Sequence, residues 1–169
     1  MIQTDIGQIK CCAEKSSKQN WDFRDRLKAC DLSIEEIDQI VHELNNKISS
    51  QIDCRSCANC CREMSPLVND REAARIARHL KISTETFKLK YLEREPKEKQ
   101  NVMQQTPCPF LKDNSCSIYD VRPGDCRSFP HLHKPEFMFR LRSVIDNYAV
   151  CPIVFNVYEG LKEELAHSI

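Results

Sequence analysis

The chain has 169 residues, of which 41% are hydrophobic, and this composition is enough to bury one sizeable core. Lysine plus arginine and aspartate plus glutamate each number 25, so no overall positive field attracts nucleic acid or anionic lipid. The N-terminus lacks the basic start and apolar stretch of a secretion signal, and no apolar run approaches the roughly 18 residues that cross a bilayer. These features predict a cytoplasmic protein with neither a membrane nor a nucleic acid as partner.

Residues 1–50 are predicted to form a helical N-terminal extension. Residues 33–36, Ser-Ile-Glu-Glu, are a capping box that begins a helix whose apolar side chains recur every three or four residues. A shorter helix is predicted from about Asp22 to Ala29. The residues before it are expected to be ragged, because chain ends are poorly ordered unless they are tied down.

Residues 51–169 are predicted to form a cysteine-cluster metal-binding domain, and we expect the whole chain to be one compact unit. An extended segment from Met64 to Val68 should lead into a helix capped by Asp70 and a second helix capped by Ser83. The charged stretch from Glu93 to Gln105 is predicted to be a solvated connection.

Further along, Lys-Asp-Asn at 112–114 is typical of a hairpin turn, so Cys108 and Cys116 on its two sides are predicted to meet. Asp120 is predicted to start one short helical turn that carries Cys126.

Alternating apolar residues from Phe137 to Leu141 predict a strand with one buried face, and Cys151-Pro152 begins a last helix. The expected fold class is therefore α+β, mainly helical, with an irregular cysteine-rich half organised around metal.

Eleven cysteines are far more thiol than packing requires. In the cytosol thiols stay reduced, so clustered cysteines indicate metal ligation or redox chemistry rather than structural disulfides. The three near the N-terminus, Cys11, Cys12 and Cys30, have no metal-like spacing and are predicted to be spare thiols. The predicted metal ligands are the ordered series Cys54, Cys57, Cys60, Cys61, Cys108, Cys116, Cys126 and Cys151.

The spacing leaves the metal and the number of sites open. Structural zinc sites use two short cysteine pairs, whereas three cysteines at steps of three favour a [4Fe–4S] cluster completed by a remote cysteine that precedes proline. Cys108 and Cys151 both fit that remote position. Cys60 and Cys61 are adjacent, so their side chains should point in different directions. This favours two four-cysteine sites, one using Cys60 and the other using Cys61. One site, with the other cysteines as packing residues, is the alternative.

Five motifs occur in order between Cys54 and Pro152: CxxCxxCC at 54–61, CPFL at 108–111, CSIY at 116–119, RPGDCRSFP at 122–130 and CP at 151–152. In these motifs the chain closely resembles the YkgJ-like CxxCxxCC cysteine-cluster family, a zinc- or iron-chelating domain. The resemblance implies metal chelation by the matched cysteines. Its relatives include flagellin lysine N-methylases, which are larger than this chain.

Three more residues in these motifs, Arg122, Arg127 and Tyr119, are predicted to lie around the cofactor. The arginines would donate hydrogen bonds to thiolates or carbonyls and offset the negative charge of a four-thiolate site, with surface ion pairs as the alternative. Tyr119 is expected to be a core aromatic rather than a proton donor.

The favoured functional hypothesis is an accessory or structural metalloprotein that binds zinc or an iron–sulfur cluster and presents a surface to a protein partner. The alternative is an iron–sulfur enzyme or electron carrier linked to protein side-chain modification, as in the flagellin methylases. No glycine-rich nucleotide loop, nucleophile elbow or HExxH motif indicates a catalytic site. Nucleic-acid binding through zinc ribbons is a third hypothesis, which the neutral net charge disfavours.

Overall fold

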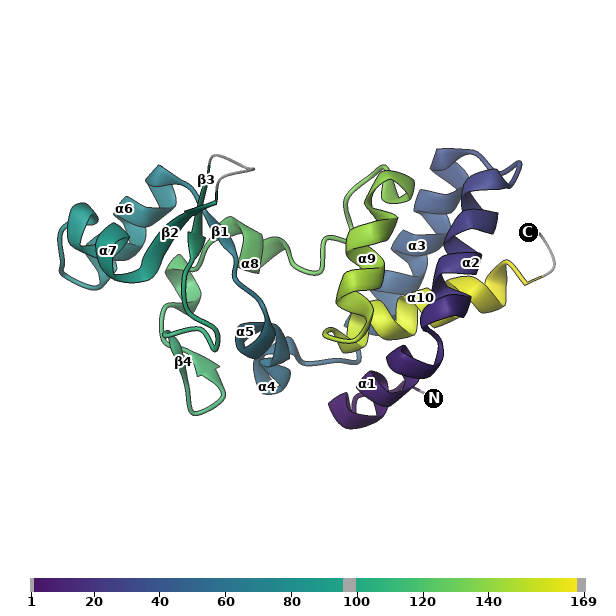
Figure 1. Ribbon diagram of the computed structural model, residues 1–169, viewed down its shortest axis with the longest axis horizontal. Coiled ribbons are helices and arrows are strands. Elements are labelled where there is room, and N and C mark those ends of the chain that lie inside the picture. The colour runs from purple at the N-terminus through teal and green to yellow at the C-terminus, as the bar shows by residue number, and fades with distance from the viewer. Residues whose placement is uncertain (1, 96–99, 167–169) are drawn as a thin grey trace. The chain divides into compact units, whose positions relative to one another are not determined.

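The computed structural model describes residues 2–95 and 100–166. It is mainly helical with two small antiparallel sheets, so the predicted α+β, mainly helical class is confirmed (Figure 1). The chain divides into two compact units. Unit 1 consists of residues 1–53 and 130–169, and unit 2 consists of residues 54–129. Residues 130–169 thus share a unit with the N-terminal helices, whereas the sequence-based division grouped them with the cysteine segments.

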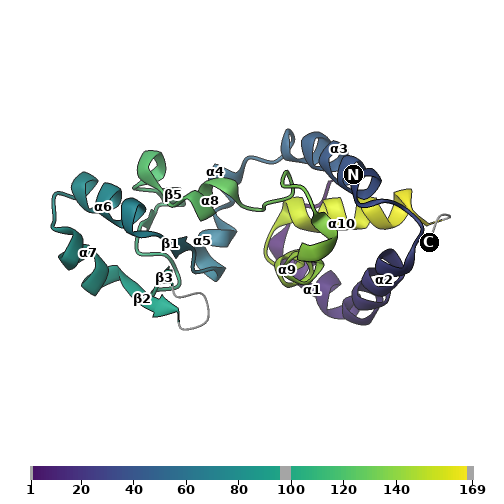
Figure 2. The ribbon, with the colours of Figure 1, turned by 90° about the horizontal axis from the view of Figure 1, so that it is seen from above.

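Unit 1 is all helical, and α10 is its most buried element. Helix α10 packs against α3, α9 and α1 (Figure 2). Tyr158 and Leu161 on this helix are fully buried, and Pro152 stands at its start as predicted. The helices are α1 (Ile6–Lys15), α2 (Ser17–Ala29), α3 (Ile34–Ser49), the 3₁₀ helix η2 (Phe137–Arg140), α9 (Leu141–Tyr148) and α10 (Pro152–Glu164).

The capping box that begins α3 is confirmed. The Glu36 backbone N–H donates to the Ser33 hydroxyl at 3.2 Å, and the Glu36 carboxylate accepts from the Ser33 backbone N–H at 2.8 Å. The expectation that the first residues are ragged is wrong. Asp5 caps α1 by accepting from the Gln8 backbone N–H at 2.8 Å, and Ile9 is fully buried, so a cap and a buried apolar anchor hold this segment.

The strand predicted at Phe137–Leu141 is also wrong, because this segment forms η2 and the start of α9. Phe137 and Leu141 are buried, but Phe139 between them is 74% exposed, which is a helical pattern and not an alternating one. The deciding contact is with α3: the Asp38 carboxylate, 8% exposed, accepts from the backbone N–H groups of Glu136 at 2.6 Å and Phe137 at 2.8 Å.

Unit 2 combines short helices with two small sheets. Strands β1, β3 and β2 form an antiparallel sheet in that order, and β4 pairs with β5. Its core includes Ile76 on α6 and Phe87 on α7. The elements are α4 (Cys54–Cys57), α5 (Asn59–Glu63), β1 (Leu67–Val68), α6 (Asp70–His79), α7 (Thr84–Tyr91), β2 (Leu92–Glu95), β3 (Gln100–Met103), β4 (Leu111–Lys112), β5 (Ser115–Cys116), the 3₁₀ helix η1 (Tyr119–Val121) and α8 (Gly124–Ser128).

Helix α6 positions α8 through one side chain. The cap of α6 is Asn69 and not the predicted Asp70, and Glu72 completes a capping box with it. The other carboxylate oxygen of Glu72 accepts from the Gly124 backbone N–H at 2.7 Å. A Cβ atom on Gly124 would lie 2.8 Å from that same oxygen, so a larger residue at this position would displace the Glu72 carboxylate. Ser83 caps α7 as predicted.

The solvated connection predicted over Glu93–Gln105 is largely a β-hairpin, apart from residues 96–99, which lie outside the described residues. Leu92 on β2 pairs with Met103 on β3, and these side chains are 7% and 1% exposed. Strand β3 also pairs with β1. The sequence pattern hid these strands because polar residues occupy most of their positions, while the few apolar ones face the core.

A substitution at Asp38 tests the contact that fixes η2. We expect Asp38→Ala to lower the free energy of unfolding of unit 1 by about 2–4 kcal/mol, because two buried backbone N–H groups lose their acceptor. Trp21, the one tryptophan of the sequence, lies on α2 in the same unit, so its fluorescence during urea unfolding measures the effect. The exposed Asp146 on α9 is the matched control, and Asp146→Ala should change stability by less than about 0.5 kcal/mol.

Candidate metal centre

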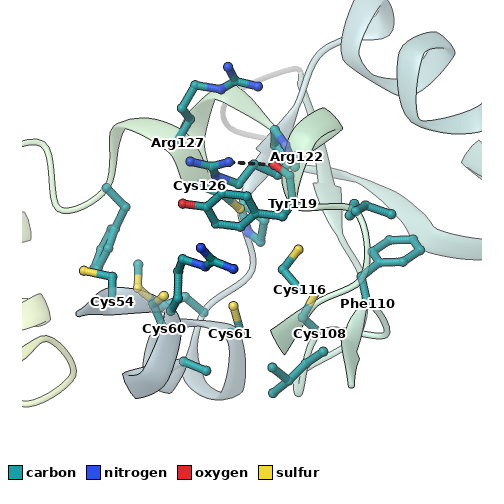
Figure 3. A pocket seen from close by; sticks show the side chains of 18 of the residues that line it. Cys54, Cys60, Cys61, Cys108, Phe110, Cys116, Tyr119, Arg122, Cys126 and Arg127 are labelled. Carbon is teal, nitrogen blue, oxygen red and sulfur yellow. Dashed lines mark hydrogen bonds between the residues drawn. The ribbon is translucent and has the colours of Figure 1, made fainter. Parts of the chain in front are cut away.

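Six of the eight predicted ligands line one pocket of about 320 Å³ in unit 2 (Figure 3). They come from three separate stretches of chain: the α4–α5 segment, the β4–β5 hairpin with the residues before it, and α8. The two halves of the cysteine series therefore meet in space, as predicted. The six are Cys54, Cys60, Cys61, Cys108, Cys116 and Cys126.

The first stretch is two very short helices joined at one left-handed residue. Ala58, between α4 and α5, has φ 48° and is 5% exposed. This change of backbone direction brings both Cys60 and Cys61 to the pocket, although adjacent side chains were expected to diverge. The Cys60 thiol donates a hydrogen bond to the sulfur of Cys61. The adjacent pair thus faces one site.

A backbone hydrogen bond joins the second stretch to the first. The Cys108 N–H donates to the Cys61 carbonyl at 2.8 Å, which sets the two cysteines side by side. The predicted hairpin follows, and its two-residue loop, Asp113 and Asn114, has φ 44° and 63°, the left-handed values of a type I′ turn. Leu111 pairs with Cys116, so the hairpin returns Cys116 to the pocket that Cys108 lines.

The tip of this hairpin is braced against α4 and α5. The Asn114 side chain donates to the Ser56 carbonyl and accepts from the Arg62 guanidinium, which in turn donates to the Cys57 carbonyl at 3.0 Å. Sequence reasoning did not find this brace. The Lys-Asp-Asn signal locates the turn, but the partners of the Asn114 amide depend on the fold of α4.

Cys126 lies on α8, as the prediction of a short helical turn required. Pro123 and not Asp120 is the residue before this helix, and Asp120 belongs to η1. The carboxylate of Asp125 accepts from the Leu67 backbone N–H at 3.1 Å, so β1 and α6 together fix α8.

Four of the thiols interact electrostatically with one another as a group, the quartet Cys61, Cys108, Cys116 and Cys126. Burial is the main cause that raises the pKa of Cys126 to about 12, and the charges of the other three raise it further. Burial first, and then the charge of Cys61, also raise the pKa values of Cys108 and Cys116, and Cys116 acts on Cys108 as well. All six pairs of the quartet are therefore close enough to interact.

Cys61 is the member of the quartet that ionises first. The hydrogen bond from Cys60 lowers its pKa to about 7, against the opposing effect of burial, and the Arg62 guanidinium contributes in the same direction. A thiolate is the form of cysteine that binds metal. The pocket therefore contains one thiol that is already partly ionised near neutral pH.

Arginines and one tyrosine border the thiols. The Arg122 guanidinium lies over the Tyr119 ring, 3.7 Å from its centroid, and donates to the Tyr119 carbonyl at 2.6 Å (Figure 3). Arg127 donates to the Asp120 carbonyl at 3.1 Å. Both arginines line the pocket, and both donate hydrogen bonds to backbone carbonyls. Tyr119 is 40% exposed, so the expectation of a core aromatic is wrong.

Arg55 was not predicted from the sequence to be a residue of the site. It lines the pocket, and its guanidinium carbon lies 5.2 Å from the centroid of the Tyr119 ring. Its position directly after Cys54 was the available signal. With Arg122 and Arg127 it gives the pocket three positive charges, against one carboxylate, that of Asp125.

The remaining cysteines lie elsewhere. Cys57 is on α4 but is not among the residues that line the pocket. Cys151 belongs to unit 1, where it precedes α10 and is 6% exposed. Cys11, Cys12 and Cys30 are also in unit 1, and Cys30 donates to the Leu27 carbonyl at 3.1 Å.

The donor set fits a thiophilic metal. Cysteine thiolates are soft ligands that select zinc or iron–sulfur clusters over magnesium or calcium. Over residues 2–95 and 100–166, no three His, Cys, Asp or Glu side chains are arranged closely enough to hold an ion. The pocket brings the thiols together on its walls, and the four thiols of the quartet act on one another electrostatically.

The chain was compared with models of known protein families. Residues 53–151 match the family described as "CxxCxxCC: Putative zinc- or iron-chelating domain". The chain belongs to this family. The match begins at Asp53, directly before the first cysteine of the cluster, and ends at Cys151, so it spans all eight cysteines of the series.

No curated protein and no solved structure matched the chain. In the described part of the chain, no helix combines the length and the apolar composition needed to cross a bilayer.

The low pKa of Cys61 gives a pH-dependent prediction for the metal-free protein. Alkylation of Cys61 should increase through pH 7 as its thiolate forms, whereas Cys126, with a pKa near 12, should stay unreactive to much higher pH. Peptide mass spectrometry after brief labelling at a series of pH values measures both midpoints. Cys60→Ala should move the Cys61 midpoint upward, since it removes the main stabilising hydrogen bond. Cys57→Ala is the control, and an equal shift in both variants would contradict the assignment.

Proposed function

We propose that this chain is an accessory metalloprotein whose thiol pocket in unit 2 binds an iron–sulfur cluster or a zinc ion. The observation that carries the proposal is the convergence of six thiols from three stretches of chain on one pocket. The quartet supplies the four thiolates that such a centre needs, with small rotations of the side chains toward the metal. Zinc and iron are the metals named for the family.

The size of the pocket favours the cluster. A single zinc ion bonds to sulfur at about 2.3 Å, so its four ligands touch and leave no cavity between them. A pocket of about 320 Å³ with thiols on several walls has room for a polynuclear centre. Its basic residues also suit a four-thiolate centre, because Arg55, Arg122 and Arg127 offset negative charge that metal-bound thiolates retain.

The metal would stabilise the protein by cross-linking short elements that are only marginally stable on their own. Helices α4 and α5 have four and five residues, and β4 and β5 have two each. Elements this short are marginal without tertiary support. A structural zinc site contributes on the order of 10 kcal/mol to folding, which is enough to fix such a region.

The setting we propose is the cytoplasm, where thiols remain reduced and available to metal, with a protein as the partner. The alternative function is an iron–sulfur electron carrier or enzyme. One observation favours it: Tyr119, at the border of the pocket, is 40% exposed, so a centre bound in this pocket would lie near the surface of unit 2.

Anaerobic purification with metal and sulfide analysis tests the proposal. We expect metal at one equivalent or more per chain, with iron, acid-labile sulfide and a brown colour for a cluster, and colourless zinc for a single ion. Cys116→Ser should lose most of this metal, because the quartet becomes incomplete. Cys30→Ser is the matched control, since Cys30 is also a half-buried thiol but lies in unit 1, and it should keep the wild-type content.

Absence of bound metal from the wild-type protein, or equal metal content in the two variants, would overturn the proposal. If the metal is an iron–sulfur cluster that undergoes reversible one-electron reduction, the electron-carrier alternative gains over the structural one.

A further inference from the structure

Arginine side chains converge on the 3₁₀ helix η1 in unit 2. Arg75 on α6 donates hydrogen bonds to the Arg122 carbonyl at 3.0 Å and to the Val121 carbonyl at 3.4 Å. Arg122 and Arg127 bind the two preceding carbonyls of this turn in the same way. Every backbone carbonyl from 119 to 122 therefore accepts a hydrogen bond from a guanidinium.

The Arg75 contact makes the arginines of η1 continuous with those of α6. Arg71, Arg75 and Arg78 follow one another at steps of four and three, so they share one face of α6, and all three are exposed. Arg55 adds a guanidinium from α4, over the Tyr119 ring. Together these side chains form the arginine surface, which consists of Arg55, Arg71, Arg75, Arg78, Arg122 and Arg127.

The positive charge of the arginine surface exceeds what unit 2 supplies to balance it. The backbone carbonyls hold guanidinia in place without neutralising them, and η1 itself supplies one carboxylate, that of Asp120. Unit 2 contains 14 lysines and arginines against 10 aspartates and glutamates, a net charge of +4 that the neutral total of the chain conceals. The sequence of this unit is thus basic, and its arginines are concentrated on α6 and η1.

The metal centre does not account for all of these arginines. Metal-bound thiolates would offset the charge of Arg55, Arg122 and Arg127, which line the pocket, but the three arginines of α6 do not line it. Their charge remains for a negatively charged partner. Because hydrogen bonds already hold the guanidinia at η1, less side-chain entropy is lost when a partner binds them.

The chemistry of the arginine surface favours protein carboxylates over nucleic acid. A guanidinium binds a carboxylate through two parallel hydrogen bonds, and arginine and tyrosine are frequent anchors of protein interfaces. Single-stranded nucleic acid binds instead through bases that stack on aromatic rings. The Tyr119 ring has the Arg122 guanidinium 3.7 Å from its centroid and that of Arg55 at 5.2 Å, so guanidinia occupy the place of a stacked base.

We infer that the arginine surface is a docking site for an acidic segment of a protein partner, whose neighbouring carboxylates bind the guanidinia of α6 and η1. This inference rests on the proposed function, which includes a protein partner, and it gives that partner a chemistry and a place on unit 2. The docked segment would lie beside the thiol pocket, because three of the six arginines line that pocket.

Binding of a fluorescein-labelled polyglutamate peptide to the anaerobically purified protein tests the inference. Fluorescence anisotropy should show binding that weakens as salt is added, because salt screens exposed charges, and a polyglutamine peptide should not bind. The double variant Arg71→Glu/Arg78→Glu should weaken polyglutamate binding by about tenfold or more, because it replaces two attractive charges with repulsive ones. It should keep the wild-type metal content, since neither residue lines the pocket.

Two further variants separate the recognition of carboxylates from the effect of net charge. Arg142→Glu, an exposed position on α9 in unit 1, should leave the affinity for polyglutamate within about twofold of the wild type. Arg71→Lys/Arg78→Lys keeps both charges but loses the planar fork, so it should weaken binding by about threefold. Wild-type affinity in the lysine variant would overturn guanidinium recognition of carboxylates.

The other outcomes are equally decisive. Absence of polyglutamate binding, or equal affinity in the wild type and Arg71→Glu/Arg78→Glu, would reject the docking site while the metal content leaves the proposed function intact. Tighter binding of a single-stranded DNA of the same length would replace the acidic partner with nucleic acid. Self-association of the wild type that Arg71→Glu/Arg78→Glu abolishes would replace it with a second copy of the chain. Absence of metal from the wild type would reject the proposed function itself.

Discussion

The hydrogen bond from the Cys108 backbone N–H to the Cys61 carbonyl is the constraint on which the thiol pocket depends. It joins the two halves of a cysteine series that a long stretch of chain separates. That stretch returns because β3 pairs with β1, and because the Met103 N–H donates to the Pro66 carbonyl at 3.0 Å. The helices and the three-stranded sheet of unit 2 thus bring the two ends of this stretch together, and the thiol pocket lies where they meet.

Local signals in the sequence predicted local structure well. The capping box at Ser33 and the turn at 112–114 depend on residues a few positions apart, so their structures follow from the sequence alone. The segment at Phe137 shows where such reasoning fails. Its alternating pattern suits a strand, but the carboxylate of Asp38, distant in sequence, binds its backbone N–H groups and selects a helical turn. Distant acceptors are not visible in a local pattern.

Some features of the candidate site were likewise predictable from the sequence, and others were not. The cysteine spacing predicted a metal centre, the resemblance in five ordered motifs indicated the family, and the hairpin prediction brought Cys108 and Cys116 together. The grouping of Cys61 with the downstream thiols could not be predicted, because it depends on the left-handed Ala58 and on the pairing of β1 with β3. Cys151 belongs to unit 1 because of the helix packing there, and the Cys-Pro motif at 151–152 does not indicate this packing.

The order of the two units along the chain has a consequence for biosynthesis. Unit 2 is one continuous segment, residues 54–129, whereas unit 1 is made of both ends of the chain. Domains fold during synthesis as soon as their residues emerge from the ribosome. All residues of unit 2, including the quartet, are therefore translated before the C-terminal part of unit 1. Helix α3 must wait for its main packing partner, α10, before the core of unit 1 can be completed.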